Sequence, residues 1–218
     1  MADDMLIPAR ALFRFEVPCR KRAGGWSEGA LLGPEYRLPN LGALEDRLEF
    51  ADVRAGWNEK GLFFSAAVTG KERTPWCRAT KAADSDGLHV WIDTRDTHNV
   101  HRATRFCHWF ALLPAGGGHL LDEPVAGLML INRARENPKH VPPQAVKVRG
   151  SVKKGGYTVE AFIPAEALTG FDAEEHPKLG FTYAVRDSEL GEQAFCCPAT
   201  LPYAEDPSLW CTLELVER

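Results

Sequence analysis

The chain has 218 residues, which suits one large all-β domain and is long enough to bury a full core. Its 26 Lys and Arg against 30 Asp and Glu give a net charge of −4, so no basic field is available to attract nucleic acid. Asp3 and Asp4 stand where a secretory signal would be basic, and no apolar run approaches the roughly 20 residues of a membrane span. These features predict a soluble cytoplasmic protein with no membrane partner.

Alternating apolar and polar positions predict β-strands through the first half of the chain, over residues 48–57, 62–69, 87–93 and 105–113. The first two strands form a hairpin, because the turn between them ends at Gly61, where a positive φ is useful. Trp76 lies in the polar loop that follows this hairpin. Pro114 and the glycines after it predict that the fourth strand stops there.

The same alternation continues in the second half, with strands expected over residues 126–131, 145–149, 157–163, 179–185 and 209–215. Pro164 begins a single helical turn over residues 164–168, since the first N–H groups of a helix need no partner within it. A chain of about nine or ten strands without a long helix can cover a sheet only with another sheet. We therefore expect one all-β domain over residues 1–218, a two-sheet antiparallel β-sandwich of immunoglobulin-like or jelly-roll-like form with one short helical turn.

The chain contains six cysteines, Cys19, Cys77, Cys107, Cys196, Cys197 and Cys211. Disulfide frameworks are typical of small secreted domains, whereas this domain is large and carries no visible export signal. The sequence has no Cys-x-x-Cys, and no histidine pair has zinc-finger spacing. We therefore expect six reduced thiols, most of them buried as small hydrophobic side chains.

Five features of the chain occur in an order typical of a known family. They are a tryptophan in the hairpin, an aromatic residue in the next loop, a strand bounded by aspartates, a Tyr-x-Val-Glu-x-x-Ile-Pro strand and a Phe-x-x-x-Val-x-Asp strand, at Trp57, Trp76, 86–93, 157–164 and 181–187. In this order they resemble the carbohydrate-binding modules of family 9, which are relatives of the wider DOMON group. The match runs from about Glu49 onward, whereas residues 1–45 match poorly and form an N-terminal strand-and-loop extension.

The resemblance implies a noncatalytic module that binds a saccharide or another polyhydroxylated ligand. Such modules stack apolar sugar faces on flat aromatic rings and bind the hydroxyls with charged or amide side chains. Family members with this clamp carry a second tryptophan after the Val-x-Asp strand, where this chain has only a phenylalanine. The resemblance therefore implies a ligand site made of Trp76, Arg95, Arg105, His108 and Phe195.

Two polar groups of residues have alternative interpretations. Four aspartates could coordinate calcium, as in some relatives, because hard cations take several oxygen ligands, or they could cap turns. Histidines and arginines gather after the strand 87–93, where they either bind an anionic or hydroxylated ligand or solvate a long hairpin. The aspartates are Asp86, Asp93, Asp96 and Asp187, and the second group is His98, His101 and His108 with Arg95, Arg102 and Arg105.

Two further functions remain open beside saccharide binding. The protein could be an intracellular interaction or scaffold protein that kept the sandwich, lost the sugar and binds a protein partner. It could also be a haem domain like some DOMON relatives, for which Met129 with His108 is the pairing we nominate. An enzyme is disfavoured, because the sequence has no nucleophile elbow, phosphate loop or HExxH motif. We expect no cofactor apart from the calcium considered above.

Overall fold

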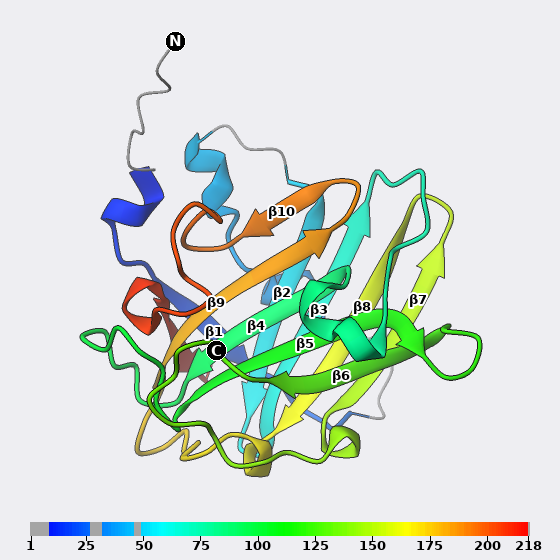
Figure 1. The fold of residues 1–218 in the computed structure, drawn as a ribbon. Helices are drawn as coiled ribbons and strands as arrows, with labels where there is room; N and C mark the ends of the chain where they lie inside the picture. The colour runs from blue at the N-terminus through cyan, green and yellow to red at the C-terminus, as the bar shows by residue number, and fades with distance from the viewer. Residues whose placement is uncertain (1–8, 27–31, 46–48, 218) are drawn as a thin grey trace.

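β-Strands dominate the computed structural model, which describes residues 9–26, 32–45 and 49–217 (Figure 1). The all-β prediction is therefore confirmed. In chain order the strands are β1 (Glu16–Lys21), β2 (Ala51–Asn58), β3 (Gly61–Thr69), β4 (Gly87–Asp93), β5 (Cys107–Gly117), β6 (Glu123–Met129), β7 (Lys147–Lys153), β8 (Gly156–Pro164), β9 (Lys178–Asp187), β10 (Gly191–Ala194) and β11 (Cys211–Val216).

Hydrogen bonds join the described strands into one sheet, in the order β6-β5-β4-β9-β11-β1-β2-β3-β8-β7, with β10 attached to β9. At the two ends of this path, β5 and β6 contact β7, so the sheet closes nearly into a barrel-like shape. The expectation of purely antiparallel strands is wrong, because β1 pairs parallel to both β11 and β2. Parallel neighbours need long connections, and β1 meets this need because most of the chain lies between it and β11.

Each of the nine predicted strands overlaps a strand of the structure, with ends that differ by a few residues. The expected start of the first strand at Leu48 lies outside the described residues, and β2 is described from Ala51. Strand β1 lies within the N-terminal strand-and-loop extension expected over residues 1–45, whereas sequence patterns missed the short β10. The expected stop at Pro114 is wrong, since β5 continues to Gly117. Its pairing with β6 shifts register between Leu113 and Gly117, and such an irregularity tolerates a proline that cannot donate a hydrogen bond.

The described helices are short 3-10 segments, and more of them occur than the single turn expected at 164–168. That turn is present as η6 (Ala165–Ala167). None of the described helices is long and apolar enough to cross a membrane. Besides η6, the described 3-10 segments are η1 (Ala9–Leu12), η2 (Pro34–Tyr36), η3 (Leu41–Glu45), η4 (Ala79–Asp84), η5 (Pro143–Ala145) and η7 (Pro207–Leu209).

The core lies between the two halves of the folded-over sheet. Phe64 of β3 stacks on Phe181 of β9 with ring centres 5.8 Å apart, and neither ring is exposed. Strand β4 is buried along its whole length, so both of its faces are covered. His89 on its outer face accepts a hydrogen bond from the Trp109 indole, and burial lowers its pKa to about 3, which keeps the imidazole neutral.

The expectation of six reduced thiols is wrong, because Cys196 and Cys211 form a disulfide with Cα atoms 6.2 Å apart. The fold brings them together, since Cys211 is paired with Phe181 in the sheet and Cys196 contacts the carbonyl of the same residue. The remaining four cysteines are buried, as predicted. Burial raises the pKa of the Cys77 and Cys107 thiols to about 12, which makes them poor nucleophiles.

Candidate functional site

An open groove of about 510 Å³ lies where the two ends of the sheet approach each other. We call it the seam groove, and it is lined by residues within 74–78, 114–122 and 150–152. Gly150 of β7 allows the close approach, because a Cβ at this position would lie 2.2 Å from the carbonyl oxygen of Pro114 in β5. The groove thus joins three segments that are far apart in the sequence.

The rim of the seam groove is apolar, and a few polar groups stand in it. Leu120 is 77 % exposed, whereas Leu121 and Val152 are each 40 % exposed. Arg78 and Asp122 also line the groove and supply opposite charges. Apolar surface with a small number of polar groups is the usual make-up of a small-molecule site.

Trp76 stands beside the seam groove, since Pro75 and Arg78 on either side of it line the groove. Its side chain is 38 % exposed, which confirms that this tryptophan is not a core residue. The Arg78 guanidinium carbon lies 5.8 Å from the centre of its ring, within the range of a cation–π contact. A flat apolar ring and a charged donor are therefore adjacent on the surface.

The loop that carries Trp76 is held by a buried ion cluster, which we define as Lys71, Asp86, Asp187 and Glu189. The Lys71 ammonium donates to both carboxylate oxygens of Asp187, at 2.5 and 2.7 Å. It also lies 3.7 Å from Asp86 and 3.5 Å from Glu189. The Lys71 and Asp187 side chains are 1 % and 0 % exposed, so water screens their attraction little.

Two carboxylates of the ion cluster also hold the backbone. Asp86 accepts hydrogen bonds from the Trp76 N–H at 2.9 Å and from the Ser188 N–H at 2.8 Å. Glu189 accepts hydrogen bonds from the N–H groups of Glu72 and Arg73, at 2.9 and 3.1 Å. The loop is therefore tied to the turn between β9 and β10.

The pKa of Lys71 reflects opposing influences. Burial lowers it, whereas the hydrogen bonds and charge of Asp187 and the charge of Asp86 raise it, and the net result is a raised pKa. Nearby Tyr157 is buried, and desolvation together with the charges of Asp187 and Asp86 raises the pKa of its phenol. At neutral pH the lysine is thus charged and the tyrosine is neutral.

The structure does not bring Trp76 together with the arginines named from the sequence. The Trp76 N–H donates a hydrogen bond to Asp86, which lies just before β4, whereas Arg95 follows the other end of β4. A strand rises about 3.3 Å per residue, so the seven residues of β4 separate the two places by about 20 Å. Trp76 therefore needs other partners, and Arg78 in the seam groove is a charged candidate because its guanidinium contacts the ring.

Three of the named residues do lie near one another at that far end. The guanidinium groups of Arg95 and Arg105 lie 4.6 and 5.0 Å from the ring centre of Phe106. His108 is fully buried beneath this end, where its Nε2 accepts a hydrogen bond from the Thr169 N–H at 2.9 Å. Burial lowers the pKa of His108 to about 4, so this residue offers no charge to a ligand at neutral pH.

Phe195 and the other two histidines of the polar group have separate surroundings. Phe195 is 1 % exposed and stacks on Tyr183 in the core, so it presents no ring to the surface. His98 pairs with Asp96, and His101 pairs with Asp206. The histidines thus do not share one site.

The four aspartates considered as calcium ligands also separate. Asp86 and Asp187 lie together around the Lys71 ammonium, which already supplies a positive charge between them. Asp93 instead accepts the N–H groups that follow β4, and Asp96 accepts the Thr212 hydroxyl. No group of three or more potential metal ligands was found among the described residues. The four aspartates thus do not form one shared site, and calcium binding stays a prediction from the resemblance.

The pairing nominated for haem is not geometrically possible. Met129 of β6 lies opposite Trp109 of β5, and His108 is the neighbour of Trp109. Neighbouring residues of a strand point to opposite faces of the sheet. Met129 and His108 therefore cannot ligate the same haem iron.

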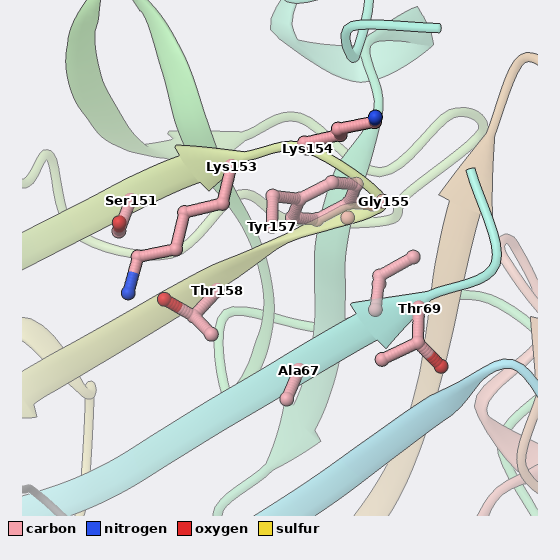
Figure 2. A pocket seen from close by; sticks show the side chains of 10 residues that line it. Ala67, Thr69, Ser151, Lys153, Lys154, Gly155, Tyr157 and Thr158 are labelled. Carbon is pink, nitrogen blue, oxygen red and sulfur yellow. The ribbon is translucent and has the colours of Figure 1, made fainter. Parts of the chain in front are cut away.

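A second, smaller hollow of about 200 Å³ lies at the turn between β7 and β8 (Figure 2). Lys153 extends back along β7 towards Ser151, while Lys154 points away from the hollow. The ring of Tyr157 lies beneath the turn and is only 2 % exposed. This hollow therefore lacks an exposed flat ring. The turn beside it contacts the start of the loop that carries Trp76, because the Lys71 N–H donates to the Gly155 carbonyl.

Comparisons with known proteins give matches in structure alone. No family model matches the chain, and no curated protein matches it in sequence. A family 9 carbohydrate-binding module from Caldicellulosiruptor kristjanssonii in complex with cellotriose aligns with a TM-score of 0.61 and 13 % identity, over 94 % of this chain and 95 % of that chain. The chain has a fold similar to that of family 9 carbohydrate-binding modules.

A second structure of such a module from the same organism, in complex with glucose, gives a TM-score of 0.56 at 11 % identity, over 94 % of this chain and 97 % of that chain. The family 9-like fold implied by the sequence is thus confirmed, while the relation to the DOMON group stays a prediction. Sequence analysis named Trp76 but missed Lys71, Arg78 and the leucines of the seam groove. The signal for Arg78 was its place two residues after Trp76 in the same polar loop.

Proposed function

We propose that this protein binds a saccharide without transforming it, in the seam groove beside Trp76. The observation that carries the proposal is the exposed indole of Trp76 next to an open groove that contains Arg78 and Asp122. An apolar sugar face stacks on the ring, while the guanidinium and carboxylate bind hydroxyls. The family 9-like fold supports this proposal, because two structures of that fold hold cellotriose and glucose.

The expected affinity is modest, because one ring and two polar partners supply only a few kcal/mol after the costs of association. We expect a dissociation constant in the range of about 1 µM to 1 mM for cellotriose, measured by titration calorimetry. Trp76→Ala should weaken binding roughly tenfold or more, since an aromatic contact contributes about 0.5–1.5 kcal/mol beyond the area it buries. Arg78→Gln should also weaken it.

Trp26→Ala is the matched control for this experiment. Trp26 is also partly exposed, but it packs beside Phe63 and Phe162 on the outer face of β3 and β8. Its replacement should leave saccharide affinity unchanged. Equal affinity of the wild type and both groove variants would reject the seam groove as the site.

A protein partner is the second candidate, and the exposed rim favours it. Leu120, Leu121 and Val152 give the seam groove more apolar surface than a sugar needs. A glycan array that includes neutral and acidic oligosaccharides separates the two candidates. Binding to no saccharide would overturn the first proposal and leave the interaction protein as the better account.

A further inference from the structure

The ion cluster that holds the Trp76 loop contains more carboxylates than cations. One ammonium, that of Lys71, lies within 4 Å of three carboxylates, which belong to Asp86, Asp187 and Glu189. Carboxylates that are buried close together repel each other and are costly to desolvate unless a cation stands between them. Lys71 supplies this cation from within the chain.

The three carboxylates reach both ends of the loop that carries Trp76. Glu189 holds the backbone at its start, through residues 72 and 73, and Asp86 holds the backbone N–H of Trp76 itself. Asp187 accepts the N–H groups of Glu189 and Leu190, which shapes the turn from which Glu189 reaches the loop. The position of the Trp76 loop thus depends on carboxylates whose mutual repulsion the Lys71 ammonium offsets.

We infer that Lys71 is a positioning residue of the saccharide site. Its ammonium holds Asp86, Asp187 and Glu189 together, and these hold the loop that carries the Trp76 indole beside the seam groove. The effect on affinity rests on the proposed function, whereas the effect on the place of the indole does not. Ligand affinity falls when the groups that support a binding residue are loosened, even if that residue is unchanged.

The test uses protein labelled with 5-fluorotryptophan, so that ¹⁹F NMR reports on each indole. Trp76→Phe assigns the resonance of Trp76. In Glu189→Ala, which removes the clamp on residues 72 and 73 from a carboxylate that is 19 % exposed, this resonance should move and broaden while those of the other tryptophans stay in place. Glu166→Ala, at an exposed glutamate of η6, is the matched control and should change nothing.

Lys71→Met tests the ammonium itself, and the pair Lys71→Met with Asp187→Asn keeps the test valid if the single variant folds poorly. In the pair, Asp86 and Glu189 remain without their cation, so the Trp76 resonance should again move. Cellotriose affinity should fall about tenfold in Glu189→Ala and in the pair, with the Trp76 side chain intact.

The outcomes separate the two proposals. An unmoved Trp76 resonance in Glu189→Ala and in the pair would overturn the inference, whatever the protein binds. A shifted resonance in a protein that binds no saccharide would overturn the proposed function and leave the positioning role supported. A shifted resonance with unchanged cellotriose affinity would show that the place of the indole does not matter for binding, and would also overturn the inference.

Discussion

Lys71→Met is expected to lower the free energy of unfolding by about 3–5 kcal/mol, because it leaves buried carboxylates without their cation. The Lys71, Asp86 and Asp187 side chains are 1 %, 2 % and 0 % exposed, so solvent offers little compensation. Replacing both partners of the closest pair, in Lys71→Met with Asp187→Asn, keeps an acceptor for the Glu189 and Leu190 N–H groups and should cost less than the single change. Urea unfolding at neutral pH measures both values.

The pH dependence follows from the raised pKa of Lys71. A lysine whose pKa is higher in the folded protein than the usual 10.5 stabilises the fold below that value and loses the contribution as pH rises through the raised pKa. The stability difference between wild type and Lys71→Met should therefore be full at pH 7 and shrink in strong alkali. A difference under about 1 kcal/mol at pH 7 would contradict the role given to the ammonium.

Phe64→Ala is expected to destabilise the protein by a similar amount, about 3–5 kcal/mol, through the cavity it leaves in the core. The Phe64 ring stacks on Phe181 with an interplanar angle of 4°, and both rings are fully buried. Strands β3 and β9 are not neighbours in the sheet, so this stack joins its two halves across the core.

Phe13→Ala is the matched control, because this ring is 65 % exposed and its removal should change stability by less than about 0.5 kcal/mol. Chemical denaturation of both variants under the same conditions gives the comparison. Similar losses from Phe64→Ala and Phe13→Ala would show that the stack does not join the two halves as described.

The strands were predictable because each has one face towards the core, which leaves an alternating pattern in the sequence. A strand was expected within residues 1–45, but the parallel pairing of β1 with two strands that are distant in sequence escaped prediction. The Cys196–Cys211 disulfide escaped for a related reason, since it depends on the pairing of β11 with β9. Both features depend on which strands become neighbours, and alternation contains no information about that.

Of the candidate site, the sequence predicted one residue, Trp76, but not how the residues are arranged in space. Trp76 was identified from its polar loop, and its exposure agrees with that interpretation. The family resemblance grouped Arg95 and Arg105 with it, but strand β4 places them at its opposite end. The seam groove itself combines residues from three distant segments, so only the closure of the sheet reveals it.

The most direct test of the central proposal is a titration of ¹⁵N-labelled protein with cellotriose, followed by NMR of the assigned backbone amides. We expect concentration-dependent shifts confined to residues of the seam groove, within 74–78, 114–122 and 150–152, and to the Trp76 indole N–H. The same titration of Trp76→Ala should give smaller shifts at equal ligand concentration. Shifts centred instead on Arg95 and Arg105, or no shifts at saturating cellotriose, would contradict the account.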